Sequence, residues 1–331
     1  MELRTLGRSG LTATRMGLGL AALGRPGYIN LGHADDLHGQ YSVLAMEARA
    51  HRVLDAAWAA GVRYFDAARA YGRAERFLGS WLLLRGYGPD SVTVGSKWGI
   101  AYAADWEVRA DVHETRDHSA AALARQLNET RELLGLQLDL YQVHSATLES
   151  GVLEDASVSS ALVALKEQGV AIGLSVTGPR QAETVRRAME ARRDGAPVFD
   201  VVQATWNLLE RSAGEALREA HEAGLGVIVK EALANGRLTE RNADAEFAGP
   251  MELLRREAAR LGTGVDGLAL AAALARPWAD VVLSGAATVD ALQSNLAALA
   301  LAVDPELLER LDAMHEDPIR YWQKRAELPW N

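Results

Sequence analysis

The chain has 331 residues, is 49% hydrophobic and carries a formal net charge of −9, so it is long enough for one large α/β domain, which we expect to span residues 1–331. Its scattered basic residues exclude a concentrated face for nucleic acid, and the absence of cysteine excludes disulfides, thiolate catalysis and cysteine-ligated metals. No segment has the uninterrupted apolar run of a signal peptide or a membrane span, so we expect a cytoplasmic protein without a membrane partner.

The first predicted element is a β-hairpin in LRTLGRSGLTATRMG, turning at residues 7–10 and capping one mouth of the fold. Apolar, β-branched runs then alternate with segments of helical period, which is typical of repeated βα units. The predicted strands are 16–20, 63–65, 92–96, 138–144, 171–176, 201–205, 226–229 and 281–284. The helices that follow them are 45–60, 74–84, 119–134, 159–168, 181–193, 213–223, 253–261 and 289–299. Eight such units predict a (β/α)₈ TIM barrel, with extra helices at 264–276 and 305–313.

Four side chains that suit proton transfer follow these strands. Asp66, Lys97 and His144 are expected just past the carboxyl ends of three strands, and Tyr71 lies in the loop after Asp66. In TIM barrels, the active site lies on the face formed by the carboxyl ends of the strands. An ammonium beside Tyr71 would lower the pKa of the phenol from its usual value of about 10, Asp66 would hold the ammonium, and His144 would hydrogen-bond a carbonyl.

Each of these residues also has a structural alternative. Asp66 could cap a helix, Tyr71 could pack on the barrel rim, and a lone strand-end histidine such as His144 is usually structural. Lys97 is harder to explain in that way, because the chain contains only four lysines and uses arginine nearly everywhere else. A compact ammonium with an adjustable pKa does what arginine cannot.

The motifs GVRYFDAARAYG, SKWG and LYQVHSA resemble, in this order, those of the aldo-keto reductase superfamily over essentially the whole chain. The resemblance implies an NAD(P)-dependent oxidoreductase that reduces an aldehyde or ketone to an alcohol. It assigns the catalytic set to Asp66, Tyr71, Lys97 and His144, with Tyr71 as the general acid.

The resemblance also implies a cofactor site. In GLSV and QATWN, Ser175 and Gln203 would bind the nicotinamide carboxamide and Trp206 would stack on the ring, although Val176 replaces the usual Asn. In VKEALANGRLT and LSGAATVDALQSN, the residues that would contact the phosphates and the adenosine are Lys230, Leu233, Gly236, Arg237, Gly285 and Asn295. Lys230 stands where the family more often has a neutral residue, so a solvated or salt-bridged lysine is the alternative there.

Cofactor preference is less marked in the sequence. Ala286, Ala287 and Ala291 stand where NADP-dependent relatives commonly have basic or polar side chains. The family default favours NADP, and NAD remains an alternative.

Two long loops, residues 21–44 and 98–118, are expected to form the pocket for a small carbonyl or alcohol substrate. Trp98, Tyr102 and Trp106 would give it an aromatic wall. Near the end of the chain, Tyr321, Trp322 and Trp330 would either fold across the mouth or cover apolar surface.

Three alternatives stay open. One is an NAD-dependent dehydrogenase that oxidises a sugar or another alcohol, and a second is a non-catalytic barrel that senses the cofactor. The third is a metal-dependent hydrolase or lyase that uses His113, Glu114, Asp117 and His118, although we expect no metal. The sequence leaves the oligomeric state open.

Overall fold

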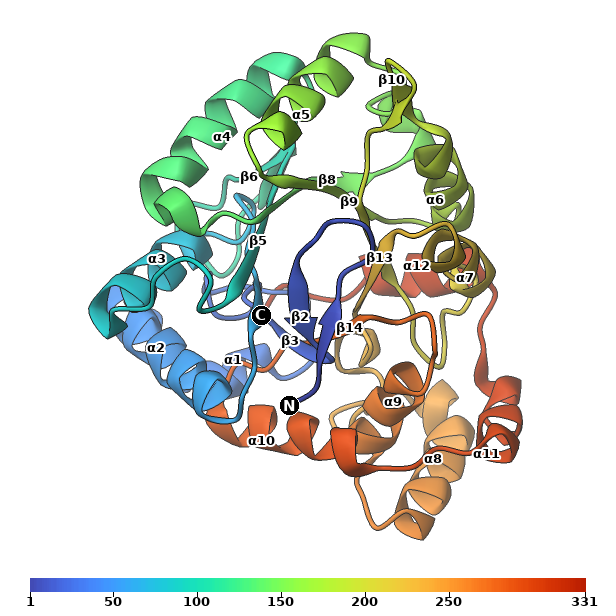
Figure 1. Ribbon diagram of the computed structural model, residues 1–331. Helices are drawn as coiled ribbons and strands as arrows, with labels where there is room; N and C mark the ends of the chain where they lie inside the picture. Colours follow the sequence, from blue (N-terminus) through green and yellow to red (C-terminus); the bar gives the residue numbers. More distant parts are fainter.

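The computed structural model describes residues 1–331, and its centre is a closed barrel of eight parallel strands (Figure 1). The barrel strands are β3 (Met16–Gly19), β4 (Tyr64–Asp66), β5 (Thr93–Trp98), β8 (Leu140–Ala146), β9 (Ala171–Val176), β12 (Val201–Thr205), β13 (Gly226–Lys230) and β14 (Val281–Ser284). The barrel closes where β14 pairs in parallel with β3. The predicted TIM barrel is confirmed, and the predicted strands agree with the observed ones to within two residues at each end.

Helices form the outer layer. They are α1 (His33–Leu37), α2 (Val43–Ala59), α3 (Ala74–Arg85), α4 (Ala120–Leu134), α5 (Ala156–Glu167), α6 (Gln181–Glu190), α7 (Gly214–Glu222), α8 (Ala248–Arg260), α9 (Val265–Leu274), α10 (Val289–Ala297), α11 (Pro305–Arg310) and α12 (Pro318–Ala326). The prediction counted the segment 253–261 among the eight helices that follow barrel strands, and it treated 264–276 as an extra helix. In the structure α9 packs against β14 and is buried on nearly every side, as its continuous apolar sequence favours.

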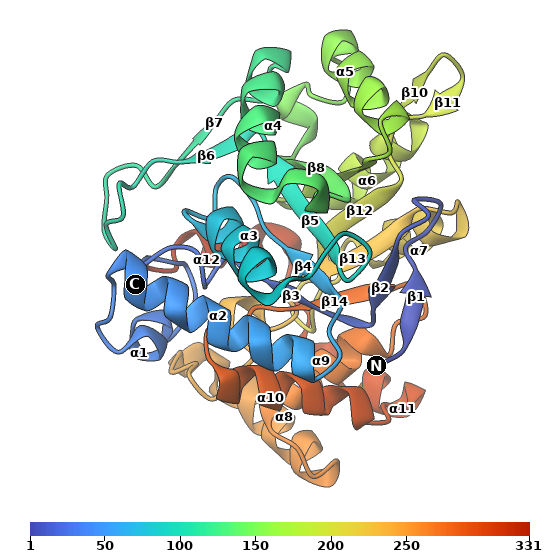
Figure 2. The same ribbon diagram turned by 60° about the vertical axis from the view of Figure 1, so that its left-hand side comes forward.

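Three short antiparallel pairs lie outside the barrel. The predicted N-terminal hairpin is present as β1 (Leu3–Thr5) and β2 (Thr12–Thr14), and the other pairs are β6 (Ile100–Tyr102) with β7 (Glu114–Arg116) and β10 (Arg192–Arg193) with β11 (Ala196–Pro197). In Figure 2, β6 and β7 reach away from the barrel toward the C-terminus. The loop after β5 is therefore a ribbon that extends the rim of the barrel.

Alternation along the strands separates the barrel interior from the helical layer. On β12, Val201 packs with the interior cluster and Val202 with the outer core. Leu6, from the turn of the N-terminal hairpin, is fully buried in that interior cluster and closes the end of the barrel where the strands begin. The interior at the opposite end, where the strands finish, carries polar side chains instead.

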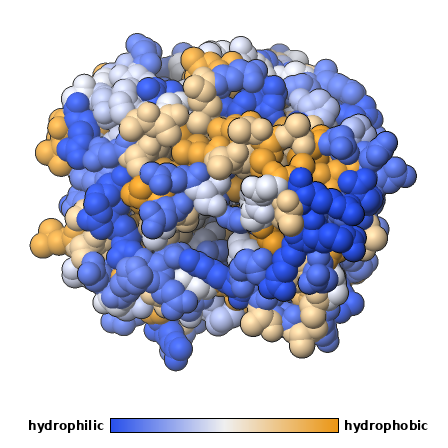
Figure 3. Space-filling model, turned by 90° about the horizontal axis from the view of Figure 1, so that it is seen from below, coloured by the Kyte–Doolittle hydropathy of each residue, from blue (hydrophilic) through white to orange (hydrophobic).

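The outer surface is mostly hydrophilic. Figure 3 shows the side that includes α10, where a band of apolar side chains crosses the hydrophilic surface. Apolar atoms contribute more than half of the accessible surface of an ordinary folded protein. None of the helices combines the length and the apolar character that crossing a bilayer requires.

Candidate active site

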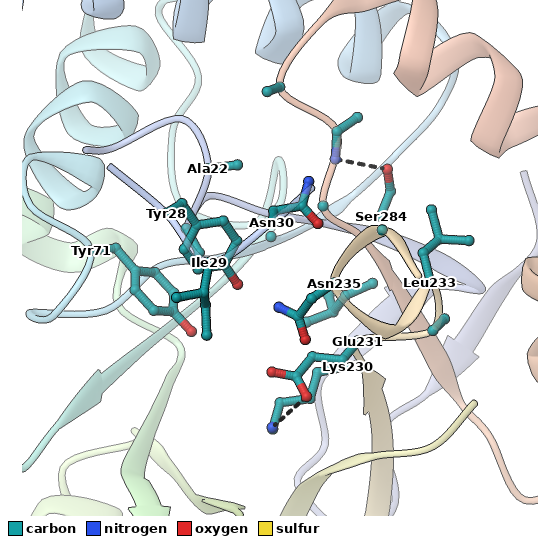
Figure 4. Close-up of a pocket in the computed structure, with 18 of the residues that line it drawn as sticks. Ala22, Tyr28, Ile29, Asn30, Tyr71, Lys230, Glu231, Leu233, Asn235 and Ser284 are labelled. Carbon is teal, nitrogen blue, oxygen red and sulfur yellow. Dashed lines mark hydrogen bonds and ion pairs between the residues drawn. The ribbon is translucent and has the colours of Figure 1, made fainter. Parts of the chain in front are cut away.

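A cavity of about 430 Å³ opens at the carboxyl ends of the barrel strands. Its lining includes Tyr71 and His144 at one end and Asn295 at the other. In Figure 4 the phenol groups of Tyr28 and Tyr71 point into this space, and Lys230 and Glu231 approach it from a separate wall. One cavity thus joins the predicted catalytic residues to the predicted cofactor residues.

The four predicted catalytic residues lie together. The Lys97 ammonium is fully buried, forms an ion pair with Asp66, and donates to the carbonyl of Ala67 at 3.0 Å and to the Tyr71 hydroxyl at 3.3 Å. The Tyr71 ring meets the His144 ring edge-on, with 5.4 Å between centroids. The prediction placed Asp66, Lys97 and His144 just past their strands, whereas they lie within the last residues of β4, β5 and β8. Strand geometry therefore fixes their backbones.

Asp66 is held by more than its lysine. It accepts hydrogen bonds from the Tyr64 hydroxyl at 3.0 Å and from the side-chain amides of Gln203 at 2.9 Å and Gln142 at 3.3 Å. A buried carboxylate needs such donors, because its attraction to one cation barely offsets the loss of hydration. The result is a rigid polar layer across the barrel interior.

Two glycines determine where the Tyr71 loop sits. Gly24 packs against this loop so closely that a Cβ at residue 24 would lie 2.2 Å from the Tyr71 carbonyl oxygen. Gly72 has a φ of 60°, which favours glycine, and a Cβ there would lie 2.5 Å from the carbonyl oxygen of Gly24. Replacing either glycine would displace the phenol from Lys97.

Arg25 is a cation beside Tyr71 that sequence reasoning missed. Its guanidinium carbon lies 5.4 Å from the centroid of the Tyr71 ring, 4.9 Å from that of Tyr28 and 5.0 Å from that of Trp330. It also donates to the Glu114 carboxylate at 2.6 Å. No local motif surrounds Arg25, so its role depends on how distant loops meet.

Burial sets the protonation of the site. It raises the pKa of Tyr71 above its ordinary value, and the negative charge of Asp66 adds to the rise. The expectation that a neighbouring cation lowers this pKa is wrong for the protein alone, because burial and Asp66 outweigh the opposing effect of Arg25. Burial also lowers the pKa of Lys97, against the pull of Asp66, and lowers that of His144 well below its usual range. Tyr71 is therefore a neutral phenol and His144 a neutral imidazole.

A strained residue links His144 to Ser175. Ser145 has a φ of 53°, and its amide donates to the Ser175 hydroxyl at 2.8 Å. Left-handed backbone at a non-glycine residue is costly and is concentrated at functional sites. Ser175 and the end of β8 are thereby held in one arrangement.

Seven of the nine predicted cofactor residues line the cavity: Ser175, Gln203, Lys230, Leu233, Gly236, Gly285 and Asn295. The other two lie outside it. The Trp206 ring follows the outward alternation of β12 and packs against Trp278, with 5.8 Å between centroids, so it does not fit the expected stacking role. Arg237 is buried away from the cavity, where it forms an ion pair with Glu316.

The predicted aromatic wall is absent, because none of its three members lines the cavity. Trp98 points outward from β5 and is fully buried in the core around the barrel. The Trp106 indole donates to the carbonyl of Tyr41 at 2.6 Å, and Tyr102 is half-buried on β6. The two expected loops do border the cavity, but they contribute charged residues such as Arg25, Glu114 and Arg116.

The end of the chain forms part of the rim. Trp330 stacks on His113 with 3.8 Å between ring centroids and lines the cavity, so this part of the tail folds across the mouth. The Asn331 side chain donates to the carbonyl of Asn30 at 3.0 Å, and its backbone exchanges hydrogen bonds with Tyr28. Three segments distant in sequence therefore meet at the rim.

The residues of the metal hypothesis serve other roles. His113 lies against Trp330, His118 contacts the carbonyl of His144 at 2.8 Å, and Asp117 accepts from the amide of Ser119 at 3.0 Å. Nowhere in the structure do three or more His, Cys, Asp or Glu side chains form a group suited to a metal ion.

Comparison with known proteins places this barrel in a family. The chain is 25% identical to the uncharacterized oxidoreductase YrpG of Bacillus subtilis, across 96% of the chain and 97% of that protein. It is 28% identical to a D-threo-aldose 1-dehydrogenase of Pseudomonas, across 69% of the chain and 70% of that protein. An aldo-keto reductase of Bacillus halodurans, solved in its holo form, superposes with a TM-score of 0.73 at 22% identity, across 96% of the chain and 97% of that structure. The sequence model of the aldo/keto reductase family matches residues 16–316, and the chain belongs to this family of oxidoreductases.

Proposed function

We propose that the protein transfers hydride between a nicotinamide cofactor and a carbonyl or alcohol substrate, with Tyr71 as the general acid when a carbonyl is reduced. One observation carries this proposal: the Tyr71 phenol, the buried Lys97 ammonium and the buried Asp66 carboxylate form a hydrogen-bonded row at the end of an open cavity. A phenol held beside a fixed ammonium is suited to giving up its proton at one defined place.

The cavity suits a nicotinamide cofactor, which the family uses. Ser175 and Gln203 line it next to the catalytic residues and would bind the carboxamide. At the far end the backbone of Gly285 borders open space, since a Cβ there would meet no atom within 4 Å. The side-chain oxygen of the buried Asn235 has no partner and Asn235 lines the same cavity, so a polar group is available to a ligand.

We propose NAD(H) rather than NADP(H) as the preferred cofactor, against the family default. Ala286, Ala287 and Ala291 line the far end of the cavity and provide no cation for a 2′-phosphate. Arg241 also lines the cavity, but its guanidinium makes two hydrogen bonds to Asp36, at 2.5 and 2.9 Å. A phosphate would have to compete with that carboxylate.

In this mechanism the bound nicotinamide would give or take the hydride, and the side chains of this protein manage the proton. Tyr71 gives its proton to the carbonyl oxygen, while Lys97, 3.3 Å from the phenol oxygen, stabilises the phenolate left behind. Asp66 keeps Lys97 charged and in place. His144, a neutral imidazole in the same cavity, would donate a hydrogen bond to the substrate oxygen.

A second candidate is the oxidation of a sugar or a similar polyhydroxylated alcohol. The charged lining supports it, since Glu114 and Arg116, from the loop that was expected to supply aromatic rings, border the cavity, and Glu231 borders it from another wall. Carboxylates and guanidinium groups bind hydroxyls well, and the similarity to a D-threo-aldose 1-dehydrogenase points the same way. Oxidation requires Tyr71 as phenolate, which its burial opposes.

The test is Tyr71→Phe, with Tyr87→Phe as a matched control on the outer layer. Aldoses and simple aliphatic aldehydes would be assayed as substrates, for oxidation with NAD⁺ and for reduction with NADH. Cofactor binding would be followed by tryptophan fluorescence. We expect Tyr71→Phe to lower kcat by about a thousandfold while cofactor binding persists, and Tyr87→Phe to leave both unchanged. Turnover that survives in Tyr71→Phe would refute the proton-donor role. Cofactor binding without turnover of any substrate by the wild type would favour a sensing module.

A further inference from the structure

We infer that Lys230 is an electrostatic tuning residue, which places an incompletely compensated positive charge beside the nicotinamide and favours the reduced cofactor over the oxidised one. The inference rests on the proposed function. It also gives Lys230 a role other than the phosphate contact expected from the sequence.

The position of Lys230 comes from strand register. It is the last residue of β13 and pairs with Thr205 of β12, the strand that carries Gln203. The next strand around the barrel is β9, which carries Ser175, and all three cavity-facing side chains border the same space as Tyr71 and His144. The predicted phosphate-binding residues Leu233 and Gly236 come later, in the loop beyond the strand. Lys230 therefore lies with the carboxamide-binding residues.

The charge of Lys230 is only partly compensated. Its ammonium donates to the neutral Thr205 hydroxyl at 2.8 Å and forms a loose ion pair with Glu231, whose nearest carboxylate oxygen is 3.7 Å away (Figure 4). That carboxylate is already bound through two nitrogens by Arg325, at 2.5 and 3.0 Å, and by Thr205 at 2.7 Å. Lys97, in contrast, is directly paired with Asp66. Lys230 therefore shares its one counter-ion with Arg325, and the group of Lys230, Arg325 and Glu231 carries an excess of one positive charge.

Burial strengthens that field. The Lys230 side chain is only 14% exposed, so solvent screens its charge less than that of a surface lysine. Its charge acts on the catalytic end of the cavity, since after burial and Lys97 it is the next cause of the lowered pKa of His144. Burial lowers the pKa of Lys230 itself to about 8, so the ammonium form predominates near neutral pH.

The two cofactor states respond differently to a neighbouring cation. The oxidised nicotinamide ring is positively charged and the reduced ring is neutral, so repulsion weakens binding of the oxidised form alone. The protein should bind NADH more tightly than NAD⁺. On the enzyme, the equilibrium should move toward reduced cofactor and oxidised substrate.

The experiment compares the dissociation constants of NAD⁺ and NADH, measured by tryptophan fluorescence and calorimetry near pH 7. Lys230→Met removes the charge, Lys230→Gln removes it but keeps a donor for Thr205, and Lys230→Arg keeps it. Lys324→Met, outside the cavity on α12, makes the same chemical change as a control. Circular dichroism confirms that each variant is folded.

We expect the ratio of the NAD⁺ constant to the NADH constant to fall by about tenfold in Lys230→Met and Lys230→Gln. It should stay near the wild-type value in Lys230→Arg and Lys324→Met. An unchanged ratio in both neutral variants would overturn the inference and leave the proposed function intact. Failure of the folded wild type to bind either nucleotide would instead overturn the proposed function.

Discussion

The two ends of the cavity are built differently. At the catalytic end, a buried ion pair between Asp66 and Lys97 is surrounded by further donors. At the far end, Ala287 and Ala291 present only methyl groups, and the notable side-chain contact is a hydrogen bond from Asn295 to Ser284 at 2.8 Å. Proton transfer requires charges fixed in place, whereas a cofactor can be held by backbone and loop closure. Substitutions at the catalytic end should therefore affect stability and chemistry together, and those at the far end should affect binding alone.

The largest effect should come from Lys97→Met. It leaves the Asp66 carboxylate buried without its cation, which should lower the free energy of unfolding by about 4 kcal/mol. Urea unfolding measures this loss, and turnover should disappear with it. Adding Asp66→Asn to Lys97→Met should restore part of the stability but none of the activity. A Lys97→Met protein as stable as the wild type would contradict the description of the catalytic end.

Lowering the pH should reduce the free energy of unfolding, because it protonates the Glu231 carboxylate. Burial alone would raise the pKa of this carboxyl, but the charges of Arg325 and Lys230 lower it to about 2. Because the folded-state pKa lies below the unfolded one, the stabilisation is complete above about pH 5 and is lost as the pH falls toward 2. Its upper bound is roughly 3 kcal/mol.

Urea unfolding at several pH values tests this. We expect the wild type to lose about 2 kcal/mol more than Glu231→Gln between pH 5 and pH 3. Glu183→Gln, on the exposed face of α6, is the control and should follow the wild type. Parallel pH profiles for wild type and Glu231→Gln would show that Glu231 contributes nothing to acid sensitivity.

The smallest effect should come from the far end, with Ala291→Arg. A guanidinium there could meet a 2′-phosphate, so NADP(H) affinity should rise by about tenfold, while NAD(H) affinity and unfolding change little. Calorimetric titration with both nucleotides measures the change, and Ala291→Gln serves as an uncharged control. A wild type that already prefers NADP(H) would contradict the NAD(H) proposal.

Much of this site could be predicted from the sequence because its residues lie in short motifs on regular strands. Asp66 and Tyr71 are five positions apart, and strand ends meet at one edge of a barrel. Trp206 and Trp98 were misplaced because a shift of one position along a strand reverses the direction of a side chain. Arg25 and Arg325 could not be found, since their contacts join segments far apart in the chain and no periodicity indicates such contacts.

The hydrogen bonds of Asn331 at the rim have a practical consequence for anyone who labels the protein. A tag or fluorophore attached after residue 331 would begin beside Tyr28 and Trp330, and would pull on the segment that borders the cavity. The hairpin at the N-terminus covers the opposite end of the barrel. A label placed there would be separated from the cavity by the full length of the strands.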